Sequence, residues 1–177
     1  MIKEFIPPAY GPFEATAAGA FSGVKLRTIQ AWTTEKLLIT DKYGRGQRRR
    51  YDVLDCIEIG IIATLTEIQI PRRIIKYVMA QLRKGTPLTL KQALGSNRAY
   101  MIIRWYRSGV RYYRSGGYGV SCVNDKHYGI RSGIDRNEKR TFKEYWMDTT
   151  IPEDGEFIKS IIVDLNYIRN EVISKMK

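Results

Sequence analysis

Apolar residues recur with a helical period through the first half of the chain, and the helices expected from them are short at first and longer afterwards. Thr16 is a candidate cap for the first helix. In the second helix, Leu26 and Ile29 are spaced to face inward. Asp52 is placed to cap the third, and Pro71 lies in the first turn of the fourth. The four predicted helices span residues 13–21, 25–38, 53–68 and 71–82.

The second half of the chain contains segments rich in apolar, aromatic and β-branched residues, and residues 139–147 alternate apolar with polar positions; both patterns are typical of β-strands. Gly116 and Gly117 interrupt one strand-like segment, so that segment is either two strands or one bulged strand. The end of the chain fits a strand over 157–163 followed by a helix capped by Asp164, and a single long helix from Glu153 is the alternative. The strand-like segments are 99–106, 110–123 and 139–147, preceded by a short helical stretch at 88–94.

Positive charge dominates the composition. The chain has 30 basic and 18 acidic residues, a net charge of +12 and an isoelectric point of about 9.8. This excess points to an anionic partner such as a nucleic acid. No apolar run is long enough to cross a membrane, and the start of the chain carries acids and prolines where a secretion signal needs an apolar stretch. We therefore expect a cytoplasmic protein without a membrane partner.

The first two predicted helices form a helix-turn-helix, joined by the tight turn Ser22–Val24, in which Gly23 can adopt a positive φ. The second helix of such a motif fits the major groove of duplex DNA. Arg and Gln side chains can contact guanine and adenine edges, while Lys and Thr suit phosphates. The polar residues on the outer face of this helix, our candidate DNA contacts, are Lys25, Arg27, Thr28 and Gln30.

The densest positive charge lies between the apolar segment "LLIT" (37–40) and the segment "RRRY" (48–51). These segments predict two short strands that flank the loop "DKYGRGQ". Together they predict a β-hairpin wing over residues 41–50, whose cations would hold the DNA backbone. The wing cations are Lys42, Arg45, Arg48, Arg49 and Arg50.

In their order along the chain, these pieces resemble the MerR family of winged-helix DNA-binding proteins. The segments that carry the resemblance are "SGVKLRTIQAW" (22–32), "TEKLL" (34–38) and "RRRYDVLDCIEIGIIATLTEIQIPRRII" (48–75). The resemblance implies that Arg27 and the wing cations Arg49 or Arg50 contact phosphates. It also implies that Tyr51 anchors the wing to the helix that follows.

Two features depart from the family pattern. Ala31 and Trp32 stand where the family has paired aromatic residues, and Trp32 is expected in the core. No sustained heptad pattern follows Leu82, where the family has a long dimerisation helix. We still expect a homodimer, because DNA-binding domains that contact only a few base pairs usually bind paired half-sites as dimers.

Catalytic and metal chemistry find little support in the sequence. Cys122, Asp125 and His127 lie close together, but one Cys and one His make a poor metal site. Cys56 is expected to be a buried, inert thiol, and two cysteines suggest no disulfide framework. No nucleophile–base pair, phosphate loop or dinucleotide fingerprint is present, so we expect neither enzymatic activity nor a cofactor.

We therefore predict an α+β protein, with a mostly helical N-terminal winged helix-turn-helix and a small β-rich C-terminal region that ends in a helix. Its predicted parts are an irregular leader (1–12), the DNA-binding domain (13–84), a linker (85–98) and a β-rich domain (99–177). The predicted function is sequence-specific binding of double-stranded DNA, as in a transcriptional regulator.

Two alternatives stay open at this point. One is a DNA-binding antitoxin or nucleoprotein-assembly component whose C-terminal domain binds a protein partner. The other is RNA or single-strand binding, because aromatic and Arg residues interleave in "WYRSGVR" and "YYRSGGY" as in a stacking platform. A hairpin with one buried aromatic face and one solvated Arg face produces the same pattern.

Overall fold

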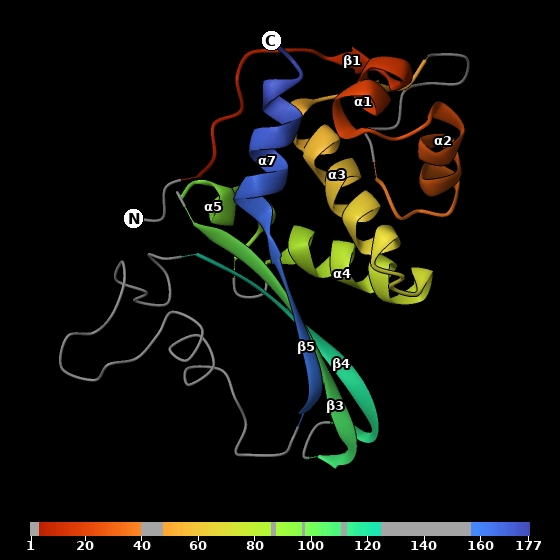
Figure 1. The fold of residues 1–177 in the computed structure, drawn as a ribbon, viewed down its shortest axis with the longest axis vertical. Helices are drawn as coiled ribbons and strands as arrows, with labels where there is room; N and C mark the ends of the chain where they lie inside the picture. The colour runs from red at the N-terminus through yellow and green to blue at the C-terminus, as the bar shows by residue number, and fades with distance from the viewer. Residues whose placement is uncertain (1–3, 40–47, 86–87, 97, 111–112, 125–156) are drawn as a thin grey trace, which may run out of the picture. The chain divides into compact units, whose positions relative to one another are not determined.

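The computed structural model describes residues 4–39, 48–85, 88–96, 98–110, 113–124 and 157–177 (Figure 1). Within them the protein is a mixed α and β structure with two small antiparallel sheets. The chain divides into two compact units, which we call the helical unit (Ile6–Ala80 and Leu165–Lys177) and the sheet unit (Met1–Phe5 and Gln81–Asp164). None of the helices in the described part combines the length and apolarity needed to cross a bilayer.

The helical unit is built around one central helix, α3, which packs against α1 and α7 (Figure 1). A two-stranded antiparallel sheet, β1 (Phe13–Glu14) with β2 (Arg50–Tyr51), lies beside α1. Its helices are α1 (Ala15–Ser22), α2 (Leu26–Thr34), α3 (Val53–Glu67), the first part of α4 (Arg72–Lys84) and α7 (Leu165–Ser174).

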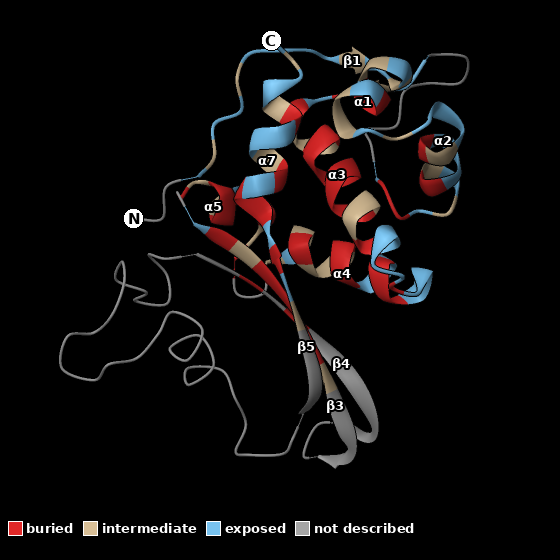
Figure 2. Ribbon diagram, viewed as in Figure 1, coloured by how far each residue is buried: buried red, intermediate tan, exposed pale blue. Residues whose placement is uncertain are grey.

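The central helix begins at a reciprocal cap. The Asp55 backbone N–H donates to Asp52 Oδ1 over 2.7 Å, and the Asp52 N–H donates to Asp55 Oδ2 over 3.0 Å. Both bonds satisfy backbone donors that the first turn of a helix leaves open. Most of the helix beyond the cap is buried, as Figure 2 shows, since apolar residues occupy nearly every side of it. The predicted cap at Asp52 is confirmed.

The other predicted helices exist with different ends: α2 ends at Thr34 rather than at Leu38, and residues 13–14 form β1 rather than the start of α1. The turn residue Gly23 has φ 69°, as predicted. Thr16 does not cap α1, because Glu14 occupies the N-cap position and Thr16 lies exposed inside the helix. Pro71 lies immediately before α4, and its carbonyl accepts hydrogen bonds from the N–H groups of Ile74 and Ile75.

The sheet unit consists of a three-stranded antiparallel sheet and one short helix. The strand order is β4-β3-β5, with bounds Tyr113–Asn124, Ala99–Val110 and Phe157–Asp164. The short helix α5 (Leu90–Leu94) packs against β3 and β4 and is capped by a reciprocal pair of hydrogen bonds between Thr89 and Gln92.

The strands predicted from the sequence are confirmed in part. The strand predicted over 99–106 exists but continues to Val110. The proposed break at Gly116 and Gly117 is wrong, because β4 runs through both glycines with Gly117 opposite Tyr106. Backbone pairing to the long partner strand holds these glycines in the extended conformation. The strand predicted over 139–147 lies outside the described residues, as do the side chains of residues 106–119 in the aromatic and Arg repeats.

The end of the chain is a strand followed by a helix, as predicted, and the single long helix is excluded. The α7 face formed by Leu165, Ile168 and Val172 is buried. This helix lies in the helical unit, however, whereas the sequence placed it in a C-terminal domain with the strands. The predicted linker is likewise part of the sheet unit, since Leu88, Leu90, Ala93 and Leu94 are buried there.

Candidate nucleic-acid interface

The turn between α1 and α2 fixes the direction in which α2 leaves α1. The Val24 N–H donates to the Gly19 carbonyl over 2.8 Å, and the Gly23 N–H donates to the Ala20 carbonyl over 3.4 Å. A Cβ added at Gly19 would lie only 2.4 Å from the Val24 carbonyl oxygen, so this approach requires glycine. Lys25 then occupies the N-cap position of α2, and its carbonyl accepts a hydrogen bond from the Thr28 N–H over 2.9 Å.

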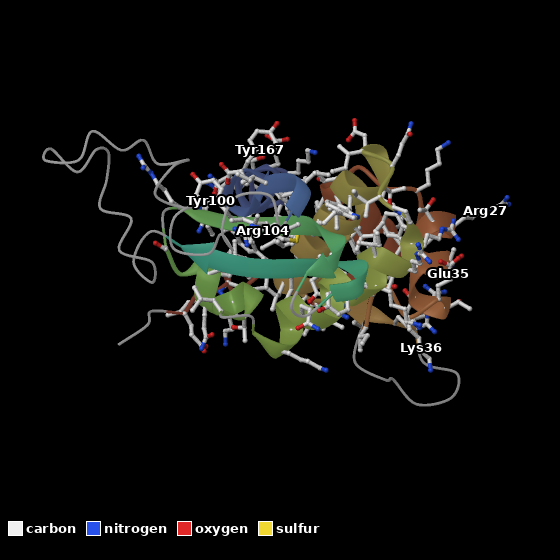
Figure 3. The ribbon with its side chains drawn as sticks, turned by 90° about the horizontal axis from the view of Figure 1, so that it is seen from below. Arg27, Glu35, Lys36, Tyr100, Arg104 and Tyr167 are labelled. Atoms are coloured by element: carbon white, nitrogen blue, oxygen red, sulfur yellow. The ribbon has the colours of Figure 1, made fainter. Side chains whose placement is uncertain are left out.

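The helix α2 has one buried side and one exposed side. Ile29 and Trp32 are buried, which confirms the prediction that Trp32 belongs to the core. On the other side Arg27 and Gln30 are exposed, and Figure 3 shows Arg27 pointing away from the body of the protein. Among the other predicted contacts, Lys25 is exposed and Thr28 is half-buried.

The inward orientation predicted for Leu26 is wrong, because this side chain is 38% exposed. Leu26 is the first residue of α2, and its side chain lines a groove that opens beside the first turn of the helix. The groove therefore receives Leu26, while Ile29 and Trp32 supply the apolar contacts of α2 to the core.

The strand pairing predicted for the wing is also wrong. Residues 37–39 form no strand, because the N–H groups of Leu37 and Leu38 both donate to the Trp32 carbonyl in a turn that ends α2. Both leucine side chains are buried, whereas successive side chains of a strand point to opposite faces. The returning strand β2 pairs instead with β1, with Tyr51 opposite Phe13.

We call residues 41–50, the predicted wing, the basic segment. The structure describes this segment from Arg48 onward, and Lys42 and Arg45 lie outside the described residues. Arg48 and Arg49 are exposed, and Arg50 is half-buried on β2. Tyr51 is buried at the junction between this segment and α3.

A groove of about 420 Å³ brings α2 and the basic segment together within the helical unit. Leu26 and Gln30 of α2 line it alongside Arg48 and Arg49 of the basic segment. Tyr51 and the start of α1 contribute to the lining as well. The groove therefore combines an apolar side chain, an amide, two guanidinium groups and the carboxylate of Glu14.

Glu14 is a lining residue that the sequence did not single out. Its Oε1 lies 3.6 Å from Nη1 of Arg48 and 3.7 Å from Nη1 of Arg50. The Arg48 side chain is 83% exposed and that of Glu14 is 47% exposed, so water screens both ion pairs strongly. Only the β1–β2 register, which sets Glu14 opposite Arg50, reveals that this acid lies among the cations.

A second ion pair joins the end of α2 to the start of α4. Arg72 Nη1 donates to Glu35 Oε1 over 2.5 Å, and both side chains are accessible to solvent. Next to it, Arg73 and Lys76 are exposed on the first turns of α4. These α4 cations were not among the predicted DNA contacts.

The two cysteines are buried thiols. Burial, with smaller effects from the carboxylates of Asp55 and Asp52, raises the pKa of Cys56 to about 12. Burial alone raises the pKa of Cys122 to about 12. The described residues contain no group of three His, Cys, Asp or Glu side chains placed to hold a metal ion, and Asp125 and His127 lie outside them.

No protein-family model and no curated protein matches the chain. The MerR-like resemblance therefore stays a prediction.

Proposed function

We propose that the helical unit binds double-stranded DNA in a sequence-specific manner, and that the protein is a transcriptional regulator of the MerR kind that uses its helix-turn-helix and the basic segment. The observation that carries this proposal is the groove, in which Leu26 and Gln30 of α2 lie beside the exposed Arg48 and Arg49 of the basic segment. Arg27 is exposed on the same helix, outside the groove lining. A recognition helix beside a cationic rim is the arrangement needed to contact base edges and the DNA backbone at once.

The exposed side of α2 supplies groups suited to base edges. Arg27, Gln30, Ala31 and Thr34 are all exposed, and their spacing of three or four residues puts them on one side of the helix. An Arg side chain matches the two acceptors of guanine, and a Gln amide matches adenine. The small side chains of Ala31 and Thr34 leave room for the helix to approach the base pairs.

The basic segment supplies groups suited to phosphates. The exposed guanidinium groups of Arg48 and Arg49 can each form charge-assisted hydrogen bonds with phosphate oxygens. These contacts carry no sequence information, so they add affinity for any duplex and orient α2 on it. The net charge of +12 adds long-range attraction to the DNA.

Selection of bound duplexes from a random pool, with the full-length protein at physiological salt, tests this proposal. We expect enrichment of one motif, and a palindromic motif with fixed spacing if the protein binds as the homodimer that we propose. An absence of enrichment, or equal retention of an RNA competitor, would contradict sequence-specific duplex binding.

A further inference from the structure

Leu26 is an aliphatic side chain in a groove whose charged lining residues are two arginines, Arg48 and Arg49, and one acid, Glu14, which pairs with Arg48. It keeps 38% of its surface exposed, and it lines the groove with Gln30, Arg48 and Arg49. Arginine rims do not favour an apolar peptide segment, whereas they attract a polyanion. An occupant of this groove therefore needs negative charge along one edge and an apolar group near Leu26.

Leu26 and Gln30 are one helical turn apart, which puts their Cβ atoms about 5–6 Å from each other on the same side of α2. Successive bases of one DNA strand are about 3.4 Å apart along the helix axis. The two side chains can therefore reach base edges that are one or two steps apart. In the major groove, the thymine C5-methyl group is the apolar feature that distinguishes one base edge from another.

We propose that this groove seats one strand of the duplex so that Leu26 covers the methyl group of a thymine next to an adenine contacted by Gln30. The phosphates of that strand lie against Arg48 and Arg49. This inference rests on the proposed function and deepens it, because it makes Leu26 a specificity-determining residue.

The thymine methyl group can be removed without any other change to the DNA, which gives a direct test. Each thymine of the selected duplex is replaced singly by deoxyuridine, and affinity is measured for the wild-type protein and for Leu26→Ala. Burial of one methyl group corresponds to about a fourfold change in affinity. We expect one thymine whose replacement weakens wild-type binding about fourfold and leaves Leu26→Ala binding unchanged.

Two variants control the experiment. Leu26→Met keeps an apolar side chain of similar volume and should retain the sensitivity to deoxyuridine. Ile68→Ala removes another exposed aliphatic side chain, 44% exposed at the end of α3 and outside the groove lining, and should also retain it.

The outcomes separate this inference from the proposed function. If the protein binds a selected duplex but no thymine shows a methyl effect, the role of Leu26 is wrong and the proposed function stands. The same conclusion follows if the methyl effect persists in Leu26→Ala. If no duplex is bound at all, the proposed function and the inference both fail.

Discussion

Gly60 of α3 lies directly against Ile168 of α7. A Cβ added at Gly60 would lie 2.8 Å from Ile168 Cγ2 and 3.5 Å from Val172 Cγ2. A separation of 2.8 Å is too short for two carbon atoms, so the missing side chain is what lets α7 pack closely on the central helix. The last helix of the chain thereby completes the core that also holds α1.

Gly60→Ala should destabilise the protein, although alanine favours the helix by about 1 kcal/mol relative to glycine. Forcing an extra methyl group into a packed core costs about 1–3 kcal/mol, and here the contact lies on the β-branch of Ile168. Ile168→Leu removes that branch at nearly constant volume, so Gly60→Ala should cost less in the Ile168→Leu background. Urea denaturation of the wild type, the two single variants and the double variant measures the coupling free energy between the two positions. If the losses of unfolding free energy are additive, this contact is contradicted.

Arg27→Ala should weaken binding to the selected duplex more than binding to unrelated duplexes. Loss of one base-contacting arginine costs about 1–3 kcal/mol of affinity and relaxes specificity at the contacted position. Competition titrations against randomised DNA measure both quantities. If affinity for all sequences falls equally, Arg27 contacts a phosphate rather than a base, as the family resemblance implies.

Arg48→Ala combined with Arg49→Ala should weaken binding to every duplex to a similar degree. Each lost phosphate contact flattens the dependence of log affinity on log salt concentration by about 0.9, so the double variant should show a slope smaller by about 1.8. Lys175→Ala combined with Lys177→Ala removes the same charge at the exposed end of the chain and is the matched control. An unchanged slope in the Arg48 and Arg49 variant would remove the basic segment from the interface.

Glu14→Gln should strengthen DNA binding. The carboxylate competes with phosphates for Arg48 and Arg50, and it repels the backbone of a bound strand. Exposed ion pairs of this kind are worth about 0.2–1 kcal/mol each, so losing the competition from both corresponds to an increase of about two- to thirtyfold in affinity. Glu67→Gln makes the same charge change at an exposed position outside the groove lining and should have a smaller effect. Equal effects of the two variants would mean that only the net charge matters.

Cys56 and Cys122 should resist thiol reagents in the folded protein. With the pKa of each thiol raised to about 12, almost no thiolate is present at about pH 8, and both side chains are buried. The unfolded chain titrates near the ordinary thiol pKa, so stability should be unaffected by these groups below about pH 9 and should fall as the pH rises toward 12. Thiol titration with and without denaturant measures the number of reactive thiols per chain. Rapid labelling of the folded protein would contradict the burial of both thiols.

The candidate site was predictable from the sequence where it depends on a single helix. The outward side of α2 follows from its spacing of polar residues, and Arg27 and Gln30 are exposed as predicted. Leu26 was wrongly predicted to face inward. The apolar period of a helix does not show how far along the helix the core extends, and here the first turn lies beyond the core. Glu14 was missed because its neighbours Arg48 and Arg50 are far from it in the sequence.

The sequence by itself determined the features that depend on near neighbours in the chain. These are the presence of the helices, the cap at Asp52, the turn at Gly23, the strand that begins at Ala99 and the excess of positive charge. Each of them follows from steric limits or hydrogen bonds between residues a few positions apart.

Only the tertiary structure decided which distant segments meet. It paired β2 with β1 instead of with residues 37–39, placed α7 on α3, and joined Leu26 with Arg48 and Arg49 in one groove. The apolar face of a helix or the edge of a strand can pack against any complementary surface, so the local sequence does not determine its partner. The choice among partners is therefore made by the packing of the whole unit, as at Gly60 and Ile168, and not by the local pattern.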